Sequence, residues 1–321
     1  MLIYTAAIIV GFALLVWGAD RFVVGAAATA HNLGVSSLLI GLTVVGFGTS
    51  APEILVSMNA AISGNPKLAI GNAIGSNIAN IALILGITAL VQPLRVRSQT
   101  LNRELPVLLA VTMLTLLPFL DQNLSRPEGF ALLGGLGLMM YWLVRVELES
   151  NVGDPMTAEL EAEIRSDMST PGAVGMLTIG LIILLASSKL LVWAAIQVAS
   201  ELGISDLVIG LTIVAVGTSL PELAASISAA LKNEHDLAIG NVIGSNMYNL
   251  LAVLGVAGSI APTDFERAVL TRDFLVLIGL TIALFAMAYN VSGEGNIKRS
   301  EGAALLIAYA SYMAFIIAGT V

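Results

Sequence analysis

Residues 34–53 read GVSSLLIGLTVVGFGTSAPE, and residues 203–222 read GISDLVIGLTIVAVGTSLPE. A second pair of segments has the same offset of 169 residues, with LAIGNAIGSNIAN at 68–80 and LAIGNVIGSNMYN at 237–249. About 26 of the 47 aligned positions from 34 to 80 are identical. Identity at this level without a gap indicates an internal duplication. The sequence therefore predicts a protein built from two related halves.

The composition indicates a membrane protein. Of the 321 residues, 57% are hydrophobic and 11% are charged, and the mean hydropathy is +0.92. A soluble domain usually has about 25% charged residues, so we expect a chain that crosses the bilayer several times. The net charge of −8 argues against a nucleic-acid partner, because a phosphate-binding surface needs clustered lysine and arginine. The absence of cysteine excludes disulfides and thiolate metal sites.

We expect an all-α membrane protein with ten transmembrane helices. Ten apolar runs are long enough to cross about 30 Å of hydrocarbon, and they lie at 3–27, 35–62, 68–91, 104–120, 128–148, 172–198, 205–231, 237–260, 272–290 and 302–319. The first run has no basic residue before it and is interpreted as a span rather than a cleaved signal. Five spans fall in each half, at 1–148 and 172–321. An odd number makes the second half enter from the opposite face, so the repeats are predicted to be inverted, as in many transporters.

Residues 149–171 are interpreted as an acidic linker between the halves. Seven acidic residues between positions 147 and 170 accompany one base, Arg165. A regulatory cation site is the alternative interpretation, although the fixed ligand spacing of a calcium loop is missing. The loops on the linker side carry eight basic residues and those on the other side carry four. The positive-inside rule therefore predicts a cytoplasmic linker, with both termini on the periplasmic side of the inner membrane.

Two glutamates fall deep inside predicted spans. They are Glu53 and Glu222, at the same position of the two repeats, and the other twenty of the 22 acidic residues lie in loops or near span ends. A lone carboxylate in hydrocarbon costs several kcal/mol, and no basic residue is placed to pair with either glutamate. Inverted symmetry would bring both near the middle of the membrane. Two close carboxylates without a base must be protonated or must hold cations.

The residues around the glutamates supply further oxygen ligands. Pro52 and Pro221 precede them and free the carbonyls of Gly48 and Gly217, since proline has no N–H to donate. The two motif pairs also supply hydroxyl and amide groups, from Thr49, Ser50, Asn72, Ser76, Asn77 and Asn80 and from Thr218, Ser219, Asn241, Ser245, Asn246 and Asn249. Packing alone could explain any single small residue, but not the whole duplicated set with a glutamate in each copy.

An all-oxygen ligand set favours a hard cation. Calcium takes six to eight such ligands in a flexible cage, whereas magnesium keeps its waters and fits less well. Zinc and copper are disfavoured, because the chain has no cysteine and its two histidines, His31 and His235, are expected in loops.

GTSAPE with GNAIGSNIAN, and GTSLPE with GNVIGSNMYN, resemble the two alpha repeats of the calcium/cation antiporter superfamily, which includes the sodium/calcium exchangers. The likeness covers the ten-span layout and is sharpest over 34–86 and 203–255, and the short linker is typical of the compact prokaryotic members. The resemblance implies exchange of calcium against sodium or protons by alternating access. It also implies that the first and sixth spans are the tilted, sliding pair that gates access.

By position, the resemblance assigns the family's ion ligands to twelve residues of this chain. The side-chain ligands would be Thr49, Ser50, Glu53, Ser76 and Asn80 in the first repeat and Thr218, Ser219, Glu222, Ser245 and Asn249 in the second, with backbone carbonyls from Phe47 and Val216. The expected partners are the transported Ca²⁺ and Na⁺, with H⁺ as the alternative to Na⁺, and the lipid bilayer. No cofactor is expected.

One departure from the family pattern bears on the coupling ion. Many sodium/calcium exchangers carry an aspartate where this chain has Asn249, and potassium-dependent members carry aspartates in both repeats. Here Asn80 and Asn249 are both amides. Two carboxylates instead of three or four make potassium cotransport doubtful and keep proton coupling through the glutamates as an alternative.

Three rival functions fit less well. A cation channel could use the same ligands, but would conduct without a counter-ion. An intramembrane enzyme could use Ser50 or Ser219 as a nucleophile, but no mid-span histidine or lysine is placed as its base. An anion or metabolite carrier would need a positive site. We therefore predict a Ca²⁺/Na⁺ antiporter that is not an enzyme, with a Ca²⁺/H⁺ antiporter as the alternative.

Overall fold

The computed structural model describes residues 2–96, 101–150, 168–201, 215–288 and 295–320. The first half contains the helices α1 (Leu2–Leu33), α2 (Ser37–Ile40), η1 (Gly41–Val45), α3 (Gly46–Thr49), α4 (Ala51–Ile62), α5 (Pro66–Ile78), η2 (Ala79–Ile84), α6 (Leu85–Val91), α7 (Leu101–Leu116), η3 (Leu117–Phe119) and α8 (Arg126–Ser150). The second half contains α10 (Thr170–Glu201), α12 (Ala215–Thr218), α13 (Leu220–Leu231), α14 (His235–Tyr248), η5 (Asn249–Val253), α15 (Leu254–Ile260), η6 (Val269–Phe274), α16 (Leu275–Ala288) and α17 (Arg299–Thr320).

By length and composition, six helical stretches of the described residues could cross a membrane, namely Ile3–Leu33, Pro66–Val91, Arg126–Arg145, Thr170–Ala194, His235–Ile260 and Val269–Ala288. A seventh forms if Gly41–Thr49 and Ala51–Ile62 count as one bent span, and two shorter apolar helices cover Glu104–Phe119 and Leu220–Leu231. These elements and α17 lie on the predicted apolar runs, with ends that differ by up to six residues, except that Leu220–Leu231 covers only the last part of the run predicted at 205–231. The predicted segment 205–214 and most of the 149–171 linker lie outside the described residues.

Several helices recur in the two halves at the offset of the sequence repeat. Helices α4 and α13 are both 12 residues long and start 169 residues apart, as do α6 and α15. Both 12-residue helices are followed by a left-handed residue, Gly64 with φ 79° and Asn233 with φ 63°. Asparagine and glycine are the residues that tolerate this conformation best after a helix. The backbone turn is therefore kept at position 233 although the residue type differs.

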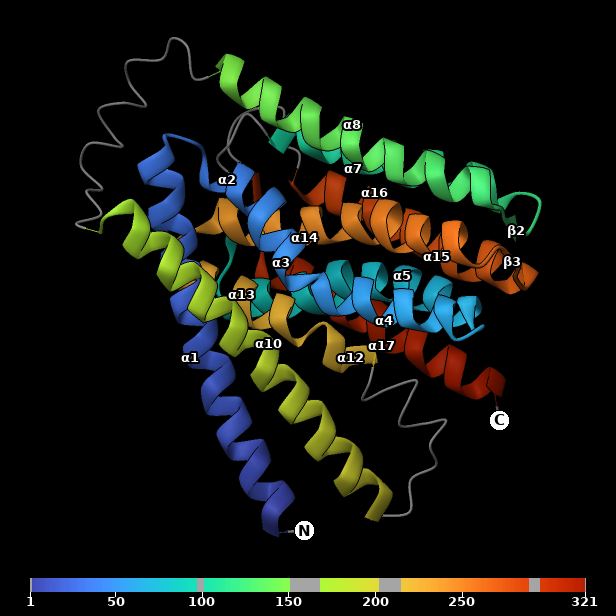
Figure 1. Ribbon diagram of the computed structural model, residues 1–321, viewed down its shortest axis with the longest axis horizontal. Coiled ribbons are helices and arrows are strands. Elements are labelled where there is room, and N and C mark those ends of the chain that lie inside the picture. Colours follow the sequence, from blue (N-terminus) through green and yellow to red (C-terminus); the bar gives the residue numbers. More distant parts are fainter. Residues whose placement is uncertain (1, 97–100, 151–167, 202–214, 289–294, 321) are drawn as a thin grey trace.

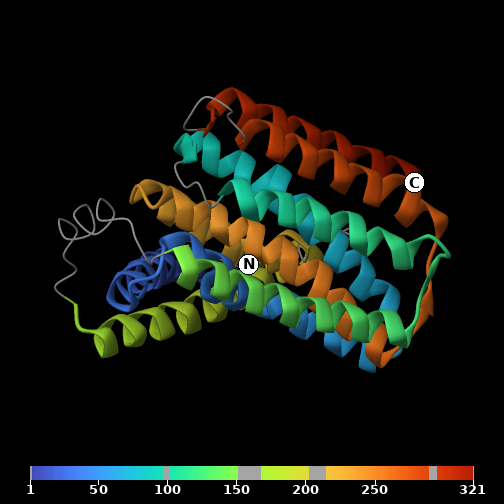
Figure 2. The ribbon, with the colours of Figure 1, turned by 90° about the horizontal axis from the view of Figure 1, so that it is seen from above.

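Helices α1 and α10 form a separate two-helix unit. They run obliquely to the other long helices, which lie roughly side by side (Figures 1 and 2). Glycines bring the two helices into backbone contact, because a Cβ added at Gly18 would lie 2.9 Å from the Leu184 nitrogen. A Cβ at Gly25 would lie 2.7 Å from the Cα of Leu177. Such close approach of small residues favours helix association in lipid.

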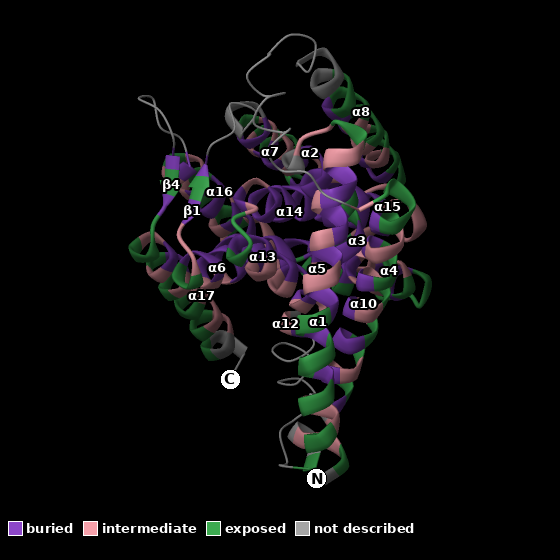
Figure 3. Ribbon diagram, turned by 90° about the vertical axis from the view of Figure 1, so that its left-hand side faces the viewer, coloured by how far each residue is buried: buried purple, intermediate pink, exposed green. Residues whose placement is uncertain are grey.

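Two continuous helical rods lie at the centre of the remaining bundle. In the most apolar stretch of each element, all residues of the α14–η5–α15 rod are buried (100%), as are 72% of those in the α5–η2–α6 rod and 22% of those in α8. Figure 3 shows this gradient, with α14 buried and much of α8 and α17 exposed. The motif residues at 68–80 and 237–249 are therefore on the innermost elements.

Short strands join the halves at the bundle ends. Strand β1 (Leu94–Val96) pairs antiparallel with β4 (Gly295–Ile297), with Leu94 opposite Ile297. Strand β2 (Asn123–Leu124) pairs antiparallel with β3 (Thr263–Asp264). Each pairing thus connects one strand of the first half to one strand of the second.

Polar side chains near helix starts are more buried than the sequence predicts. His235, expected in a surface loop, is the first residue of α14 and is 6% exposed, and His31 lies in the last turn of α1. Glu104 and Asp273, again 169 residues apart, are near helix starts but only 2% and 9% exposed. Residues near the ends of predicted spans were expected at the surface, but neighbouring helices cover these side chains.

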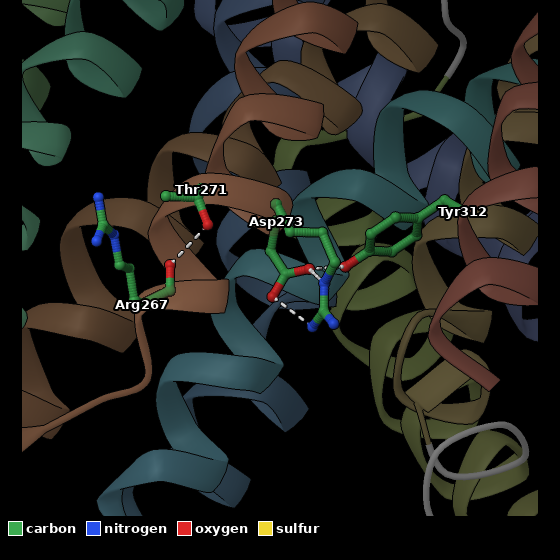
Figure 4. A network of polar contacts seen from close by, with 5 residues as sticks. Arg267, Thr271, Asp273 and Tyr312 are labelled. Carbon is green, nitrogen blue, oxygen red and sulfur yellow. Dashed lines mark hydrogen bonds and ion pairs between the residues drawn. The ribbon is translucent and has the colours of Figure 1, made fainter. Parts of the chain in front are cut away.

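The Asp273 carboxylate links the side chains of Arg272 and Tyr312 (Figure 4). It accepts hydrogen bonds from Arg272 Nε at 2.6 Å and Nη2 at 3.0 Å, and from the Tyr312 hydroxyl at 2.9 Å. Two parallel bonds from a guanidinium are among the stronger polar contacts in proteins. The cluster therefore connects η6 to α17.

Replacing Asp273 with Asn is expected to lower the midpoint of thermal unfolding in detergent. The substitution leaves Arg272 without its charged acceptor, which corresponds to about 1–3 kcal/mol. The matched control is Glu266→Gln, which alters an exposed carboxylate just before the same segment. Equal midpoints for the two variants would contradict a stabilising role for the cluster.

Candidate cation-binding site

Proline places both glutamates at a helix break. The segments Gly41–Thr49 and Ala51–Ile62 are bent by 50° around Ser50, and Pro52 lies at the start of the second segment. Ser219, the equivalent of Ser50, has nearly the same backbone angles and precedes Pro221. A proline that cannot donate its N–H is a common cause of such a kink. As a result, each glutamate lies in the first turn of a new helix in the middle of its span.

The two glutamates are buried without a basic partner. Each is 1% exposed. The ion pairs found among the described residues involve Asp20, Lys232 and Arg272 with their neighbours, and none of them reaches Glu53 or Glu222. The carboxylates are close enough for the charge of one to act on the other. The positive end of a helix dipole favours each carboxylate but compensates only part of its charge.

Each carboxylate faces hydroxyl groups of the other half. Ser50 Oγ donates to Glu222 Oε1 at 3.3 Å. The hydroxyls of Thr218 and Ser219 lie near the Glu53 carboxylate. The two GTS segments therefore cross, and their four hydroxyls surround the pair of carboxylates.

Two asparagines hold the glutamate helices in equivalent ways. Asn72 Nδ2 donates to the Glu53 carbonyl at 3.3 Å and to Ser57 Oγ at 3.0 Å. In the second half, Asn241 Nδ2 donates to the Glu222 carbonyl at 3.2 Å and to Ser226 Oγ at 2.9 Å. Each asparagine thus joins a glutamate helix to the central rod of its own half and restricts the orientation of that glutamate.

Further contacts tie α3 of the first half to α14 of the second. Thr49 Oγ1 donates to Asn241 Oδ1 at 3.0 Å and lies 3.4 Å from Ser245 Oγ. The backbones touch here, because a Cβ added at Gly46 would lie 3.2 Å from the Cα of Gly244. Glycine at these positions permits the hydroxyl and amide groups to meet across the interface.

Several buried polar atoms have no hydrogen-bond partner among the described residues. They include both carboxylate oxygens of Glu53, Oε2 of Glu222 and Oγ of Ser219. Both amide atoms of four fully buried asparagines share this property, at Asn77, Asn80, Asn246 and Asn249. Buried polar groups are almost always paired, so a set of this kind indicates a place for a polar ligand. The donor set is oxygen-rich and negatively charged, which suits a hard cation.

Asn80 and Asn249 lie in π-helical turns. Asn80 is in η2 and Asn249 begins η5, and both turns interrupt the central rods directly after the GSN motifs. Short π-helical insertions are frequent at functional sites, because the wider turn redirects side chains. No feature of the amino-acid pattern predicted these turns.

Five of the residues assigned from the sequence lie next to the two carboxylates or contact a residue that does. They are Thr49, Ser50, Thr218, Ser219 and Ser245. Ser76, Asn80 and Asn249 are also buried, and their part in an ion site stays a prediction. Phe47 and Val216 were assigned only through their carbonyls. The Phe47 ring is 54% exposed and packs edge-on against Tyr248, with centroids 5.5 Å apart, while the Val216 carbonyl accepts from the Ser219 N–H at 3.2 Å.

Three serines were not assigned from the sequence. Ser57 and Ser226 accept hydrogen bonds from Asn72 and Asn241, and they are one of three identical pairs between 54–62 and 223–231. That identity was a usable signal. Ser188 of α10 donates to the Gly217 carbonyl at 3.0 Å, so the carbonyl freed by Pro221 has a partner from the two-helix unit. Ser188 has no counterpart in α1, where Ala19 is the equivalent residue.

The described residues contain no group of three or more histidine, cysteine, aspartate or glutamate side chains that could hold a metal ion. A cation at this site would therefore rely on two carboxylates and several neutral oxygens. Such a mixed set suits calcium or sodium better than zinc.

Comparison with known proteins gives one consistent result. Residues 3–145 and 172–318 match the family described as sodium/calcium exchanger protein. The putative antiporter CaxA of Alkalimonas amylolytica is 49% identical, over 97% of this chain and 98% of that protein. The inner membrane protein YrbG of Escherichia coli is 41% identical over 89% of each chain. A structure of the sodium-calcium exchanger NCX_Mj soaked with Na⁺ and Ca²⁺ has a TM-score of 0.85 and 32% identity, and covers 98% of both chains.

Replacing Asn241 with Ala is expected to destabilise the protein more than Asn72→Ala. Asn241 is 1% exposed and contacts Thr49 in addition to its own glutamate segment, whereas Asn72 is half-buried. Each buried group left unpaired costs about 1–3 kcal/mol. Thermal unfolding in detergent measures the difference, with the exposed Asn59→Ala as the matched control. An unfolding midpoint of Asn241→Ala equal to that of Asn59→Ala would contradict a stabilising role for the Asn241 hydrogen bonds.

Proposed function

The chain belongs to the sodium/calcium exchanger family, and we propose that it exchanges Ca²⁺ for Na⁺ across the inner membrane by alternating access. Its relatives are named as antiporters and exchangers rather than enzymes. The observation that carries the proposal is the pair of buried glutamates, Glu53 and Glu222, which have no basic partner among the described residues. Three of their carboxylate oxygens and the Ser219 hydroxyl have no hydrogen-bond partner among the described residues.

The proposed ligand set is the one assigned from the sequence. The carboxylates of Glu53 and Glu222 supply the charge. The hydroxyls of the GTS and GSN motifs and the amides of Asn80 and Asn249 supply neutral oxygens, and the carbonyls of Phe47 and Val216 complete the set. Six to eight oxygens in a deformable cage meet the requirement of calcium.

Electrostatics explains why the ions would compete. The empty site carries a charge of −2, which is costly to bury and to move. One Ca²⁺ neutralises it, and so do two Na⁺, whereas calcium and sodium together would leave an excess of positive charge. The carrier would therefore change state with one kind of ion or the other, which is the condition for exchange rather than leak.

Proton coupling is the second candidate. Asn80 and Asn249 leave the site with only two acids, and both can be neutralised by protons as well as by sodium. The likeness to NCX_Mj, which is named as a sodium-calcium exchanger, favours sodium.

We propose that the chain crosses the membrane ten times, as two inverted repeats of five spans at 1–148 and 172–321. The helices that recur at the 169-residue offset, α4 with α13 and α6 with α15, and the strand pairing between the halves support this arrangement. The acidic linker at 149–171 would be cytoplasmic and both termini periplasmic. The two-helix unit of α1 and α10 would slide against the bundle to gate the site, a proposal supported by its oblique direction relative to the other long helices (Figure 1).

Glu53→Gln and Glu222→Gln are each expected to reduce ⁴⁵Ca²⁺ uptake into proteoliposomes to the level of protein-free liposomes. Glutamine keeps the shape of the side chain but removes the charge that balances calcium. Uptake by the unchanged protein should require an outward Na⁺ gradient. The exposed Glu266→Gln serves as the matched control and should retain uptake.

Uptake at the control rate in either glutamate variant would contradict the assignment of the site. Uptake driven by an outward proton gradient and not by Na⁺ would establish the second candidate. Calcium flux that needs no opposing ion would indicate a channel and overturn exchange.

Reporter fusions test the orientation. A reporter active only in the periplasm, fused to the N-terminus or C-terminus, is expected to be active in both positions. Insertion of the same reporter into the 149–171 linker is expected to leave it inactive, since the loops on that side hold eight of the twelve counted basic residues. Activity in the linker and silence at the termini would reverse the topology.

A further inference from the structure

An ion pair joins the two-helix unit to the bundle. Lys232 Nζ, at the end of α13, lies 2.6 Å from Asp20 Oδ1 on α1. The side chains are 33% and 40% exposed, respectively. Arg21 lies beside the same carboxylate, with its Nε 3.9 Å from Asp20 Oδ2, and its guanidinium sits over the Trp17 ring at 5.6 Å. The contact is therefore a specific, partly sheltered link between α1 and α13.

The link belongs to the part of the molecule that covers the candidate site. Helix α1 packs against both α10 and α13. A Cβ added at Gly48, one residue before the GTS hydroxyls, would meet Leu181 of α10 at 3.1 Å and Phe22 of α1 at 3.7 Å. Movement of the α1–α10 unit along α13 would therefore change what lies over the GTS segment.

The ion pair has no counterpart in the related half. The repeat offset of 169 residues relates Asp20 to Lys189 and Lys232 to Ser63. Lys189 is exposed and has no ion pair among the described residues, and Ser63 carries no charge. Helix α10 also lacks extensive packing on α4, the equivalent of the α1–α13 contact, within the described part of the chain. The two-helix unit thus makes an ion pair and extensive packing with α13, whereas the described residues show no equivalent contact with α4.

This asymmetry defines what the second access state requires. In a carrier of two inverted repeats, the other state is approximated by exchanging the conformations of the repeats. Helix α10 would then pack on α4, and α1 would leave α13. Asp20 and Lys232 would separate, while no ion pair could replace theirs between positions 189 and 63.

We propose that the Asp20–Lys232 ion pair is a latch that forms in one access state only and biases the carrier toward that state. The proposal rests on the proposed function, because it needs two access states. A contact made in one of two states shifts their populations by its own free energy. Asp20 and Lys232 are accordingly positioning residues that set how often the site opens on each side, and neither residue contacts the transported ion.

A distance measurement tests the latch without requiring transport. The chain has no cysteine, so Ile9→Cys on α1 and Ile62→Cys on α4 can be spin-labelled without background. Both side chains are exposed, at 65% and 66% respectively, and neither residue belongs to the ion pair. Pulsed electron paramagnetic resonance in lipid nanodiscs then gives the populations of the two distances, with Na⁺ and with Ca²⁺.

Asp20→Asn and Lys232→Met are each expected to raise the population of the state without the ion pair about two- to fivefold. This factor corresponds to the free energy that a partly exposed ion pair contributes. The charge swap Asp20→Lys with Lys232→Asp should return the populations toward those of the unchanged pair. Lys189→Met, at the equivalent position of α10, is the matched control and should change nothing. Unchanged populations in both single variants, or a charge swap no better than the single variants, would overturn the latch.

Calcium uptake measured on the same variants separates the two proposals. Loss of the latch should alter the exchange rate while exchange still depends on the opposing ion. If the distances respond as expected but the unchanged protein exchanges no ions, the latch stands and the proposed function fails.

Discussion

Two carboxylates buried side by side without a base are the constraint on which the rest of this structure depends. Glu53 and Glu222 are each 1% exposed, and no ion pair of the described residues reaches them. Charges buried in this way need protons or cations. The hydroxyl and amide groups around them, several without hydrogen-bond partners among the described residues, are consistent with a cation as the ligand. The family of sodium/calcium exchangers, to which the chain belongs, gives that ligand its proposed identity.

The fold holds these two side chains in equivalent positions of the two halves. A proline after each GTS segment breaks the helix, so that a glutamate begins a new helix inside a span. Asn72 and Asn241 then fix each glutamate segment to a central rod. Glycines at the contact between α3 and α14 let the polar groups of the two halves meet. In contrast, α1 and α10 are joined mainly to each other, and on our proposal this separation permits the site to open on alternate sides.

Much of this arrangement could be predicted from the sequence because it was duplicated. The repeat located the glutamates, the prolines and the asparagines, and the apolar runs placed most of the helices to within six residues. The prediction was less successful where tertiary contacts decide the outcome. Burial of Glu104, His235 and Asp273 depends on neighbouring helices that their own positions do not reveal. The π-helical turns at Asn80 and Asn249 have no signal in the amino-acid pattern, and the Ser188 contact to Gly217 joins two different helices.

Equilibrium binding of ⁴⁵Ca²⁺ to the purified protein, measured while Na⁺ is titrated, tests the central claim most directly. The account predicts that the unchanged protein binds calcium and that Na⁺ displaces it completely, because both ions neutralise the same pair of charges. It also predicts no such binding in Glu53→Gln or Glu222→Gln. Calcium that stays bound in saturating Na⁺, or that binds either variant as tightly as the unchanged protein, would contradict it.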